Sequence, residues 1–226
     1  MTAHPLDRPV WHALRSRQAV MAVGGDRALR FMPDVAPFAA AADDSQASLA
    51  ALAALGPAEG HVVLIQASDG ALPPGTIAET ITAGVQMVAQ RLTPLGGQAA
   101  IEPLTESDAP AMLALATLTA PGPFRERTHR LGDFLGVKHD GRLVAMAGER
   151  MKPDGFTEVS GVCTHPDARG RGYAKHLSHA VATRIVERGE TPFLHAYASN
   201  VGAIALYQGL GFVIRSKMTI TALARG

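Results

Sequence analysis

The residues with the clearest chemical potential lie in a glycine-rich turn, Arg169-Gly-Arg-Gly-Tyr-Ala174. A run typical of a β-strand, Glu158–Thr164, precedes the turn, and a helical pattern follows it. The first N–H groups of a helix have no partner inside the helix, and the helix dipole favours negative charge at that end. Glycine lets the backbone approach an anion closely. The turn therefore predicts a site for phosphate oxygens.

Two common phosphate-binding motifs do not fit this turn. No G-x-x-x-x-G-K-[ST] pattern surrounds Gly170 and Gly172, which excludes a P-loop. The dinucleotide fingerprint G-x-G-x-x-G/A fails at its third position, where Lys175 stands. What remains is R-x-x-G-x-A at Arg169, Gly172 and Ala174. Taken alone, this short pattern also fits an ordinary strand-to-helix turn.

A second pattern lies downstream and contains Asn200, Ala203, Tyr207, Gly211 and Phe212. In combination with the glycine turn, it resembles the GNAT superfamily of acyl-CoA N-acyltransferases. That family combines an R/Q-x-x-G-x-G/A turn with an N-x-x-A-x-x-x-Y-x-x-x-G-F helix, in this order. The resemblance covers roughly Gln98 to the C-terminus and is greatest to the branch that includes glycine N-acyltransferase-like proteins.

The resemblance implies an α/β (α+β) fold of the GNAT type. Its sheet is mixed and mostly antiparallel, its central strands splay apart, and helices flank it. We expect residues 98–226 to form the acyltransferase domain. Residues 1–97 would form an N-terminal α/β region of unknown role, which could be a degenerate GNAT-like half.

Hydrophobic periodicity and turn signals predict the individual elements. Strands are expected at Ala19–Val23, Ala28–Phe31, His61–Gln66, Val85–Leu92, Gln98–Leu104, Phe134–His139, Arg142–Arg150, Thr157–Thr164, Pro192–Ala198 and Phe212–Leu223. Helices are expected to begin at the cap Asp43-Asp44-Ser45 and to span Ser107–Leu118, Ala168–Arg188 and Val201–Gly209. Asp140-Gly141 predicts a tight hairpin turn.

By resemblance, the acyl donor is acetyl-CoA, bound as a substrate. Main-chain N–H groups of the turn would hold its pyrophosphate, and the central strand would offer its edge to the pantetheine arm and an N–H to the oxyanion. The residues implied in cofactor binding are Val162, Cys163, Thr164, Arg169, Gly170, Arg171, Gly172, Tyr173, Ala174, Asn200 and Tyr207. The Arg171 side chain could contact the pyrophosphate or be solvated.

Acyl transfer from a thioester to an amine needs a route for the amine's proton and an acid for the leaving thiolate. Glu158 stands where family members with a strand glutamate carry their base, and Glu149 or water are the alternatives. Tyr207 is the candidate acid, because a phenol with a pKa of about 10 can protonate a thiolate whose pKa is about 8.5. The alternatives are an exposed glutamate at the strand end and a tyrosine in the core.

Other reactive residues give weaker patterns. Cys163 could be an acyl-enzyme nucleophile, but no base adjoins it and buried cysteines are common in protein cores. The histidines show no metal-ligand spacing, so no metal is expected. His129 and the nearby Arg125, Arg127 and Arg130 could shape an acceptor site or form an exposed basic helix.

Composition narrows the class of protein. The 226 residues carry a formal net charge of +1, which gives no electrostatic reason to expect nucleic acid or an anionic membrane as a partner. The one cysteine excludes an internal disulfide framework, and Asp7 and Arg8 interrupt any apolar run of a signal peptide. We expect a cytoplasmic enzyme, with a homodimer as one option.

The sequence therefore predicts an N-acetyltransferase that moves an acetyl group from acetyl-CoA to a primary amine by direct transfer in a ternary complex. A small-molecule amine is the favoured acceptor, because no acidic or basic stripe suggests a macromolecule. The alternatives are a non-catalytic CoA-binding sensor or scaffold and an acyltransferase that uses a longer acyl-CoA.

Overall fold

A computed structural model describes residues 4–57, 59–67, 70–97 and 99–226. Its main feature is an eight-stranded sheet with the order β4-β11-β5-β10-β9-β8-β7-β6. The strands are β4 (Val62–Gln66), β5 (Thr76–Val88), β6 (Glu102–Leu104), β7 (Phe134–His139), β8 (Arg142–Glu149), β9 (Phe156–Thr164), β10 (Thr191–Tyr197) and β11 (Val213–Arg225). All neighbours pair antiparallel except β9 and β10, which are parallel.

The parallel pair of strands separates soon after it begins. Thr191–Phe193 of β10 pair with Phe156–Glu158 of β9, and the pairing ends there although both strands continue. From Val159 onward, β9 has no strand partner on the side that faces β10. The splayed central strands and the mostly antiparallel sheet confirm the fold class predicted from the sequence.

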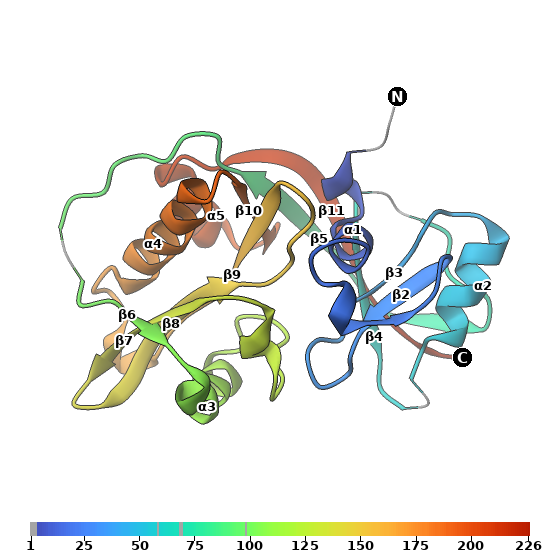
Figure 1. The fold of residues 1–226 in the computed structure, drawn as a ribbon, viewed down its shortest axis with the longest axis horizontal. Coiled ribbons are helices and arrows are strands. Elements are labelled where there is room, and N and C mark those ends of the chain that lie inside the picture. Colours follow the sequence, from blue (N-terminus) through green and yellow to red (C-terminus); the bar gives the residue numbers. More distant parts are fainter. Residues whose placement is uncertain (1–3, 58, 68–69, 98) are drawn as a thin grey trace.

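Two helices cover opposite faces of β8 and β9 (Figure 1). Helix α4 (Tyr173–Glu187) buries Leu177, Val181 and Ile185 against one face. Helix α3 (Ala109–Thr119) packs on the other face and shares a core cluster with Cys163. Both faces of β8 and β9 are therefore covered by helices.

The helix starts differ from the prediction at two points. Helix α4 begins at Tyr173, five residues after the expected Ala168, because a 3₁₀ turn and the glycine turn come first. Ser107 does not cap α3. A 3₁₀ turn, Glu106–Asp108, precedes α3, and Thr105 forms a capping box with Asp108 at the start of this turn. Ser45 caps α2 (Gln46–Ala54) as expected, by accepting a hydrogen bond from the Ser48 N–H.

The hairpin between β7 and β8 turns at Asp140 and Gly141. Both residues have positive φ angles, 51° and 77°, as a two-residue type I′ turn requires. The predicted turn is confirmed.

The N-terminal elements gather beside one end of the large sheet (Figure 1). They are short 3₁₀ turns at Pro5–Asp7 and Ala19–Met21, α1 (Pro9–Leu14), α2, and a three-stranded sheet of β1 (Ala22–Gly24), β2 (Ala28–Phe31) and β3 (Ala39–Ala41). The strand expected at Ala19–Val23 is therefore half 3₁₀ turn. The all-alanine strand β3 has no polar alternation and gave no signal in the sequence.

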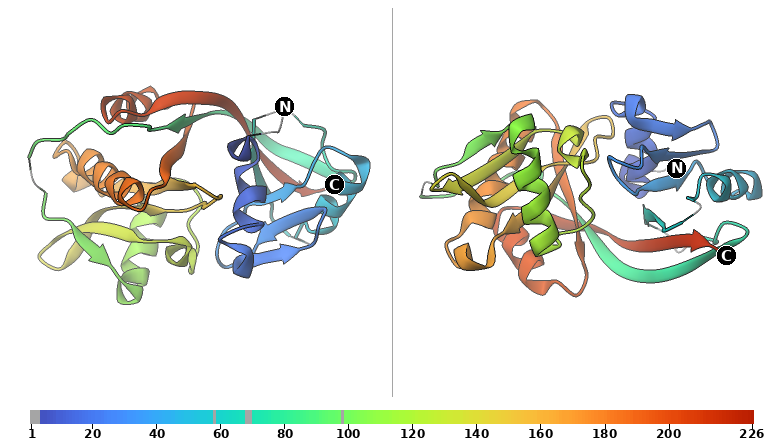
Figure 2. Two further views of the ribbon diagram at one scale, coloured as in Figure 1. Left: turned by 45° about the horizontal axis from the view of Figure 1, so that its top comes forward. Right: turned by 90° about the horizontal axis from the view of Figure 1, so that it is seen from below.

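The large sheet crosses the domain boundary expected at residue 97. Strand β5 lies between β10 and β11, and β4 lies on the far side of β11, so both strands from the first half belong to the same sheet as the second half. Figure 2 shows β5 and β11 running together from the region of α4 to the region of α2. The two halves therefore share the large sheet, and the first half also has the small three-stranded sheet.

Most predicted strands of the large sheet agree with the structure to within two residues at each end, and β5 and β6 differ by more. Strand β5 spans Thr76–Val88, whereas Val85–Leu92 was expected, because its exposed first part mixes threonine and glutamate with isoleucine and lacks a clear apolar pattern. Strand β6 covers only Glu102–Leu104, and Gln98, the expected start, lies outside the described residues. No helix of the described part of the chain is long and apolar enough to cross a membrane.

Candidate active site

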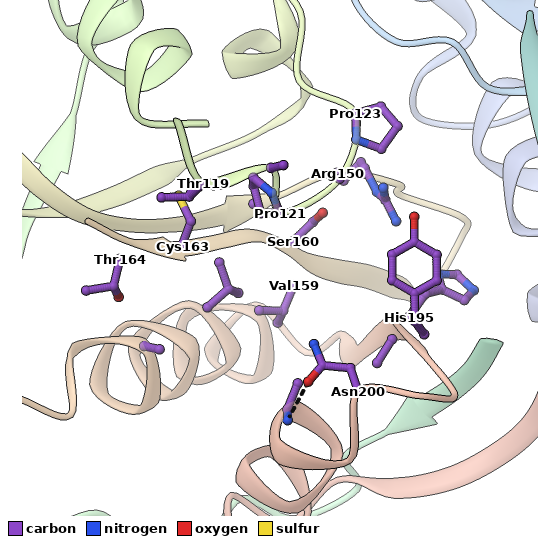
Figure 3. Close-up of a pocket in the computed structure, with 18 of the residues that line it drawn as sticks. Thr119, Pro121, Pro123, Arg150, Val159, Ser160, Cys163, Thr164, His195 and Asn200 are labelled. Atoms are coloured by element: carbon purple, nitrogen blue, oxygen red, sulfur yellow. Dashed lines mark hydrogen bonds between the residues drawn. The ribbon is translucent and has the colours of Figure 1, made fainter. Parts of the chain in front are cut away.

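A cavity of about 780 Å³ follows the gap between β9 and β10. It begins at the glycine turn, passes between the splayed strands and continues beside the N-terminal elements. Figure 3 shows part of its lining, with Arg150 and His195 at one end and Cys163 and Thr164 toward the other. One cavity thus joins the predicted cofactor residues to a part of the chain for which the sequence suggested no role.

The open edge of β9 forms one wall of this cavity. All residues from Val159 to Thr164 line it, although successive side chains of a strand point to opposite faces. Consecutive lining residues mean that the cavity runs along the strand edge itself, where backbone N–H and C=O groups are available. An extended chain with amide groups, such as a pantetheine arm, can pair with such an edge.

A bulge shapes the middle of β9. Its register with β8 shifts between Met146 and Gly148, and Gly161 has a φ of 62°. Bulges bend a strand and increase its local twist, and glycine accepts this φ without strain. The bulge lies where β9 turns away from β10, so it helps to hold the gap open.

The glycine turn presents a row of unpartnered backbone donors. Among the described residues, the N–H groups from Gly170 to Lys175 make no hydrogen bond, and no side chain caps the helix start at Gly172. Gly170 and Gly172 have φ angles of 77° and 78°, which favour glycine. Free N–H groups at the start of the 15-residue helix α4 fit the pyrophosphate of coenzyme A.

Tyr173 and Thr164 complete this end of the cavity. The Tyr173 hydroxyl lies 2.8 Å from the His139 Nε2, which fixes the first residue of α4 to β7. The Thr164 hydroxyl is buried and has no partner in the described structure. An unpaired buried hydroxyl costs free energy unless a ligand or water satisfies it.

Helix α5 (Val201–Gly209) carries two of the predicted residues into the cavity. The Asn200 Oδ1 accepts a hydrogen bond of 3.1 Å from the Ala203 N–H and caps the helix (Figure 3). Tyr207 lines the cavity on the next turns, and no described residue hydrogen-bonds to its hydroxyl. Burial raises the pKa of the Tyr207 phenol to about 12. This phenol stays protonated at neutral pH and can donate.

The structure argues against Glu158 as a general base. Glu158 is the third residue of β9 rather than its first, its side chain is fully buried, and it does not line the cavity. Two hydrogen bonds of 2.8 and 2.6 Å join its carboxylate to Arg150. Burial alone would raise the pKa of Glu158, but Arg150 and the bond to His195 outweigh it and lower the pKa to about 2. Such a carboxylate does not take up a proton near neutral pH.

His195 shares this buried network, and both of its ring nitrogens have hydrogen-bond partners. Arg215 donates to the Gln86 Oε1 over 2.8 Å, so the other end of the Gln86 amide is its NH₂ group. That NH₂ lies 3.0 Å from the His195 Nε2, which must therefore accept. The His195 Nδ1 then carries the proton and donates to Glu158 over 2.6 Å. Neither ring nitrogen is free to act as a base.

The second candidate base, Glu149, is occupied as well. It is buried and pairs with Lys152 at 2.7 Å and with Arg188 at 2.5 Å, outside the main cavity. Its carboxylate is therefore engaged by two cations and does not face the cavity.

Cys163 contributes to the cavity wall, but its thiol faces α3. Burial raises the pKa of Cys163 to about 11, although hydrogen bonds with Thr119 and with the Met146 backbone act to lower it. A thiol with this pKa is almost fully protonated at neutral pH and is a poor nucleophile.

The basic cluster around His129 lies outside the cavity. His129 and Arg130 contact Glu106 at 3.0 and 2.6 Å, and Arg127 pairs with Asp34 at 2.7 Å. The loop just before this cluster, Thr119–Pro123, lines the cavity instead, and Figure 3 shows Pro121 and Pro123 beside Ser160. Among the described residues, no group of three or more histidine, cysteine or carboxylate side chains could hold a metal ion.

The far part of the cavity was not predicted. We call it the sheet-extension arm, because neighbouring strands β4, β11 and β5 build it. Its apolar and hydroxyl side chains are Val63, Ile65, Thr80, Thr82, Ile220 and Ala222. His61 and Glu79 stand at its rim as an exposed ion pair of 3.2 Å, and Phe38 covers it beside Arg150. The strand residues of this arm come from three separate segments of the chain, so no local sequence motif predicts the arm.

Comparison with known proteins agrees with the fold. The model of the FR47-like protein family matches residues 134–220, which contain the glycine turn and Tyr207. A protein from Novosphingobium aromaticivorans that is assigned to the GNAT family of acetyltransferases is 45% identical. The match covers 99% of this chain and 100% of that chain, with a TM-score of 0.92. The chain belongs to the GNAT family of acetyltransferases.

Two more distant structures share the fold. A GCN5-related N-acetyltransferase from Kribbella flavida is 20% identical over 96% of this chain and 92% of its own, with a TM-score of 0.63. A GCN5-related N-acetyltransferase-like protein from Streptococcus suis is 15% identical over 95% and 92%, with a TM-score of 0.61. Both matches include the N-terminal elements. No curated protein matches the chain.

Proposed function

We propose that this protein transfers an acetyl group from acetyl-CoA to the primary amine of a small molecule, by direct transfer in a ternary complex. The observation that carries the proposal is the continuity of one cavity. That cavity joins the unpartnered N–H groups of the glycine turn, the open edge of β9 and the free hydroxyl of Tyr207.

Each part of the cavity suits one part of the donor. The N–H groups from Gly170 to Lys175 would hold the pyrophosphate, with Arg169 and Arg171 exposed beside them. The pantetheine arm would lie along Val162–Thr164 and pair with the strand edge. The thioester would then reach the gap between β9 and β10, within the part of the cavity that Tyr207 lines.

The chemistry needs one acid and a route for one proton. The neutral amine attacks the thioester carbon, and a backbone N–H of β9 stabilises the oxyanion. When the carbon–sulfur bond breaks, the thiolate takes a proton from the Tyr207 phenol. The amine gives up a proton through water, and this proton returns to the tyrosinate. Because the pKa of Tyr207 is about 12, the phenol recovers its proton readily.

The state of Cys163 favours direct transfer over an acyl-enzyme. Its buried thiol has a pKa of about 11, and no described residue offers it a base, so Cys163 does not compete with the amine as a nucleophile.

The length of the acyl chain and the branch of the GNAT family are two questions separate from this proposal. Acetyl is the favoured acyl group, and rates with acetyl-, propionyl- and benzoyl-CoA compare it with longer donors. Kinship with glycine N-acyltransferase-like proteins stays a prediction from the two motifs.

Two experiments test the function together. Calorimetric titration with acetyl-CoA and with a desulfo analogue should give saturable binding of both, because the main contacts go to the phosphates and the pantetheine arm. A thiol-release screen against mixed amines should then show acetyl-CoA turnover only when an amine is present. No binding at millimolar acetyl-CoA would refute the proposal, and binding without turnover on any amine would favour a non-catalytic CoA sensor.

A further inference from the structure

The side chains of the sheet-extension arm form two rungs across three strands. Ala222 of β11 pairs with Val63 on one side and with Thr80 on the other. Two residues further, Ile220 pairs with Ile65 and with Thr82. Directly paired residues, and residues two apart on one strand, point to the same face. The two rungs therefore form one continuous surface that is apolar except for the two threonine hydroxyls.

This surface connects directly to the gap between β9 and β10. Gly84, two residues beyond Thr82 on β5, pairs with Tyr197 of β10, and Tyr197 lines the cavity. A Cβ at Gly84 would lie 3.0 Å from the Ile220 Cδ1 and 3.3 Å from the Ala196 carbonyl oxygen. Glycine thus keeps side-chain bulk out of the junction between the arm and the reacting centre.

The charges around the arm do not suit an anion. The charge of Arg150 is balanced by Glu158, and its guanidinium stacks 4.6 Å from the Phe38 ring centre. Both ring nitrogens of His195 are occupied by hydrogen bonds with Gln86 and Glu158. Among the described lining residues, Glu79 is the single carboxylate, and it lies at the rim. The register between β5 and β11 shifts at Glu79, and a register shift of this kind changes the direction in which the local side chains point.

From these features we infer that the acceptor is a primary amine on a long, unbranched apolar chain. This inference rests on the proposed function and names its substrate class. The amine would lie at the gap between β9 and β10, and the chain would lie on the two rungs. The distance along β5 from Gly84 to Thr80 is about 13 Å at roughly 3.3 Å per residue. An extended chain of about ten carbons covers it, with bonds of about 1.5 Å.

A series of n-alkylamines tests the inference. We expect kcat/KM to rise about two- to fourfold per methylene from butylamine to octylamine, because each buried methylene adds hydrophobic free energy. The rise should level off near decylamine, where the arm ends. If no amine releases thiol from acetyl-CoA, the proposed function itself fails. If butylamine reacts and octylamine reacts no faster, this inference fails and the proposed function stands.

Variants of β5 locate the chain in the arm. Thr82→Phe should lower kcat/KM for octylamine by about 10- to 100-fold and leave butylamine within about threefold, because the ring blocks the second rung. Thr80→Phe should affect only decylamine and longer chains. Ile81→Phe is the matched control, since Ile81 is 66% exposed, alternates with the arm residues and does not line the cavity. Equal losses in Thr82→Phe and Ile81→Phe would overturn the inference.

The rim carboxylate gives a second, independent check. Octylamine should react faster than 8-aminooctanoate, whose free carboxylate would approach Glu79. Glu79→Gln should reduce this preference several-fold while acetyl-CoA affinity, measured by calorimetry, stays constant. A preference for the amino acid over octylamine in the wild type would contradict the inferred acceptor.

Discussion

The two ends of the cavity offer different means of recognising a ligand. The glycine-turn end offers exposed backbone N–H groups at Gly170–Lys175, whereas the sheet-extension arm offers apolar side chains on paired strands. Backbone recognition depends on φ angles and on an uncapped helix, and few side chains take part. Side-chain recognition depends on strand register. The first end can therefore stay constant while the second changes with the acceptor.

The largest loss of cofactor affinity is expected at the glycine turn. Gly172→Glu should lower acetyl-CoA affinity by at least about 100-fold, because it adds a negative charge where the pyrophosphate would lie. Calorimetry measures the affinity. Gly189→Glu is the matched control, since Gly189 has the same φ of 78° at the other end of α4 and open space around it. Equal affinities in the two variants would show that the turn is only structural.

Tyr207 lines the same cavity that contains these two ends. Tyr207→Phe should lower kcat by about 10²–10⁴-fold, the usual range for a general acid, with little change in acetyl-CoA affinity. Since the pKa of Tyr207 is about 12, the wild-type rate should show no loss of this acid below about pH 11. A thermal melt of the variant separates activity from stability. Normal kcat in a folded Tyr207→Phe protein would remove the phenol from the mechanism.

Variants of Glu158 test whether this residue, predicted to be a general base, instead stabilises the fold as a buried anion. Its folded pKa of about 2 lies below the ordinary value of 4.5. The pair with Arg150 therefore stabilises the fold fully above pH 4.5, and this stabilisation is lost as the pH falls toward 2. A shift of this size corresponds to about 3 kcal/mol.

Denaturant unfolding at neutral and acidic pH measures that contribution. Glu158→Gln should lose about 3 kcal/mol of stability at pH 7, because Arg150 is left as a buried cation without its partner. Its stability should also fall less steeply than that of the wild type between pH 4.5 and 2. Glu106→Gln, which breaks an exposed pair, should change stability much less. A stable Glu158→Gln variant with altered pH–rate behaviour would return the base role to Glu158.

The smallest effect is expected at Cys163. Cys163→Ala should keep kcat within about threefold and cost about 1 kcal/mol of stability, because the thiol packs under α3 and has a raised pKa. Steady-state kinetics and a melt decide this. A loss of kcat comparable to that of Tyr207→Phe would indicate an acyl-enzyme.

The sequence predicted the glycine-turn end well because its signals are local. Glycines at 170 and 172, the Asn200 cap and the helix Val201–Gly209 each lie within a few residues of the feature they specify. The GNAT fold and its splayed strands followed from the same motifs. The Asp140-Gly141 turn was local too, since its positive φ angles depend on those two residues.

The rest could not be predicted because it depends on pairing across the chain. Glu158 has an apolar strand beside it, which suggested a raised pKa, but Arg150 and His195 reach it only in the folded sheet. The sheet-extension arm joins residues near 63, 81 and 221, and nothing local specifies that β5 lies between β10 and β11. The first half therefore showed no site of its own.

The central claim is that coenzyme A binds through the backbone of the turn and of β9. Amide hydrogen exchange of the protein with and without acetyl-CoA tests it most directly, because the N–H groups from Gly170 to Lys175 are unpartnered in the described structure. We predict strong protection at these amides and at Val162–Thr164, with little change in β4 and β11. Calorimetric binding of acetyl-CoA without protection of the turn would contradict the account.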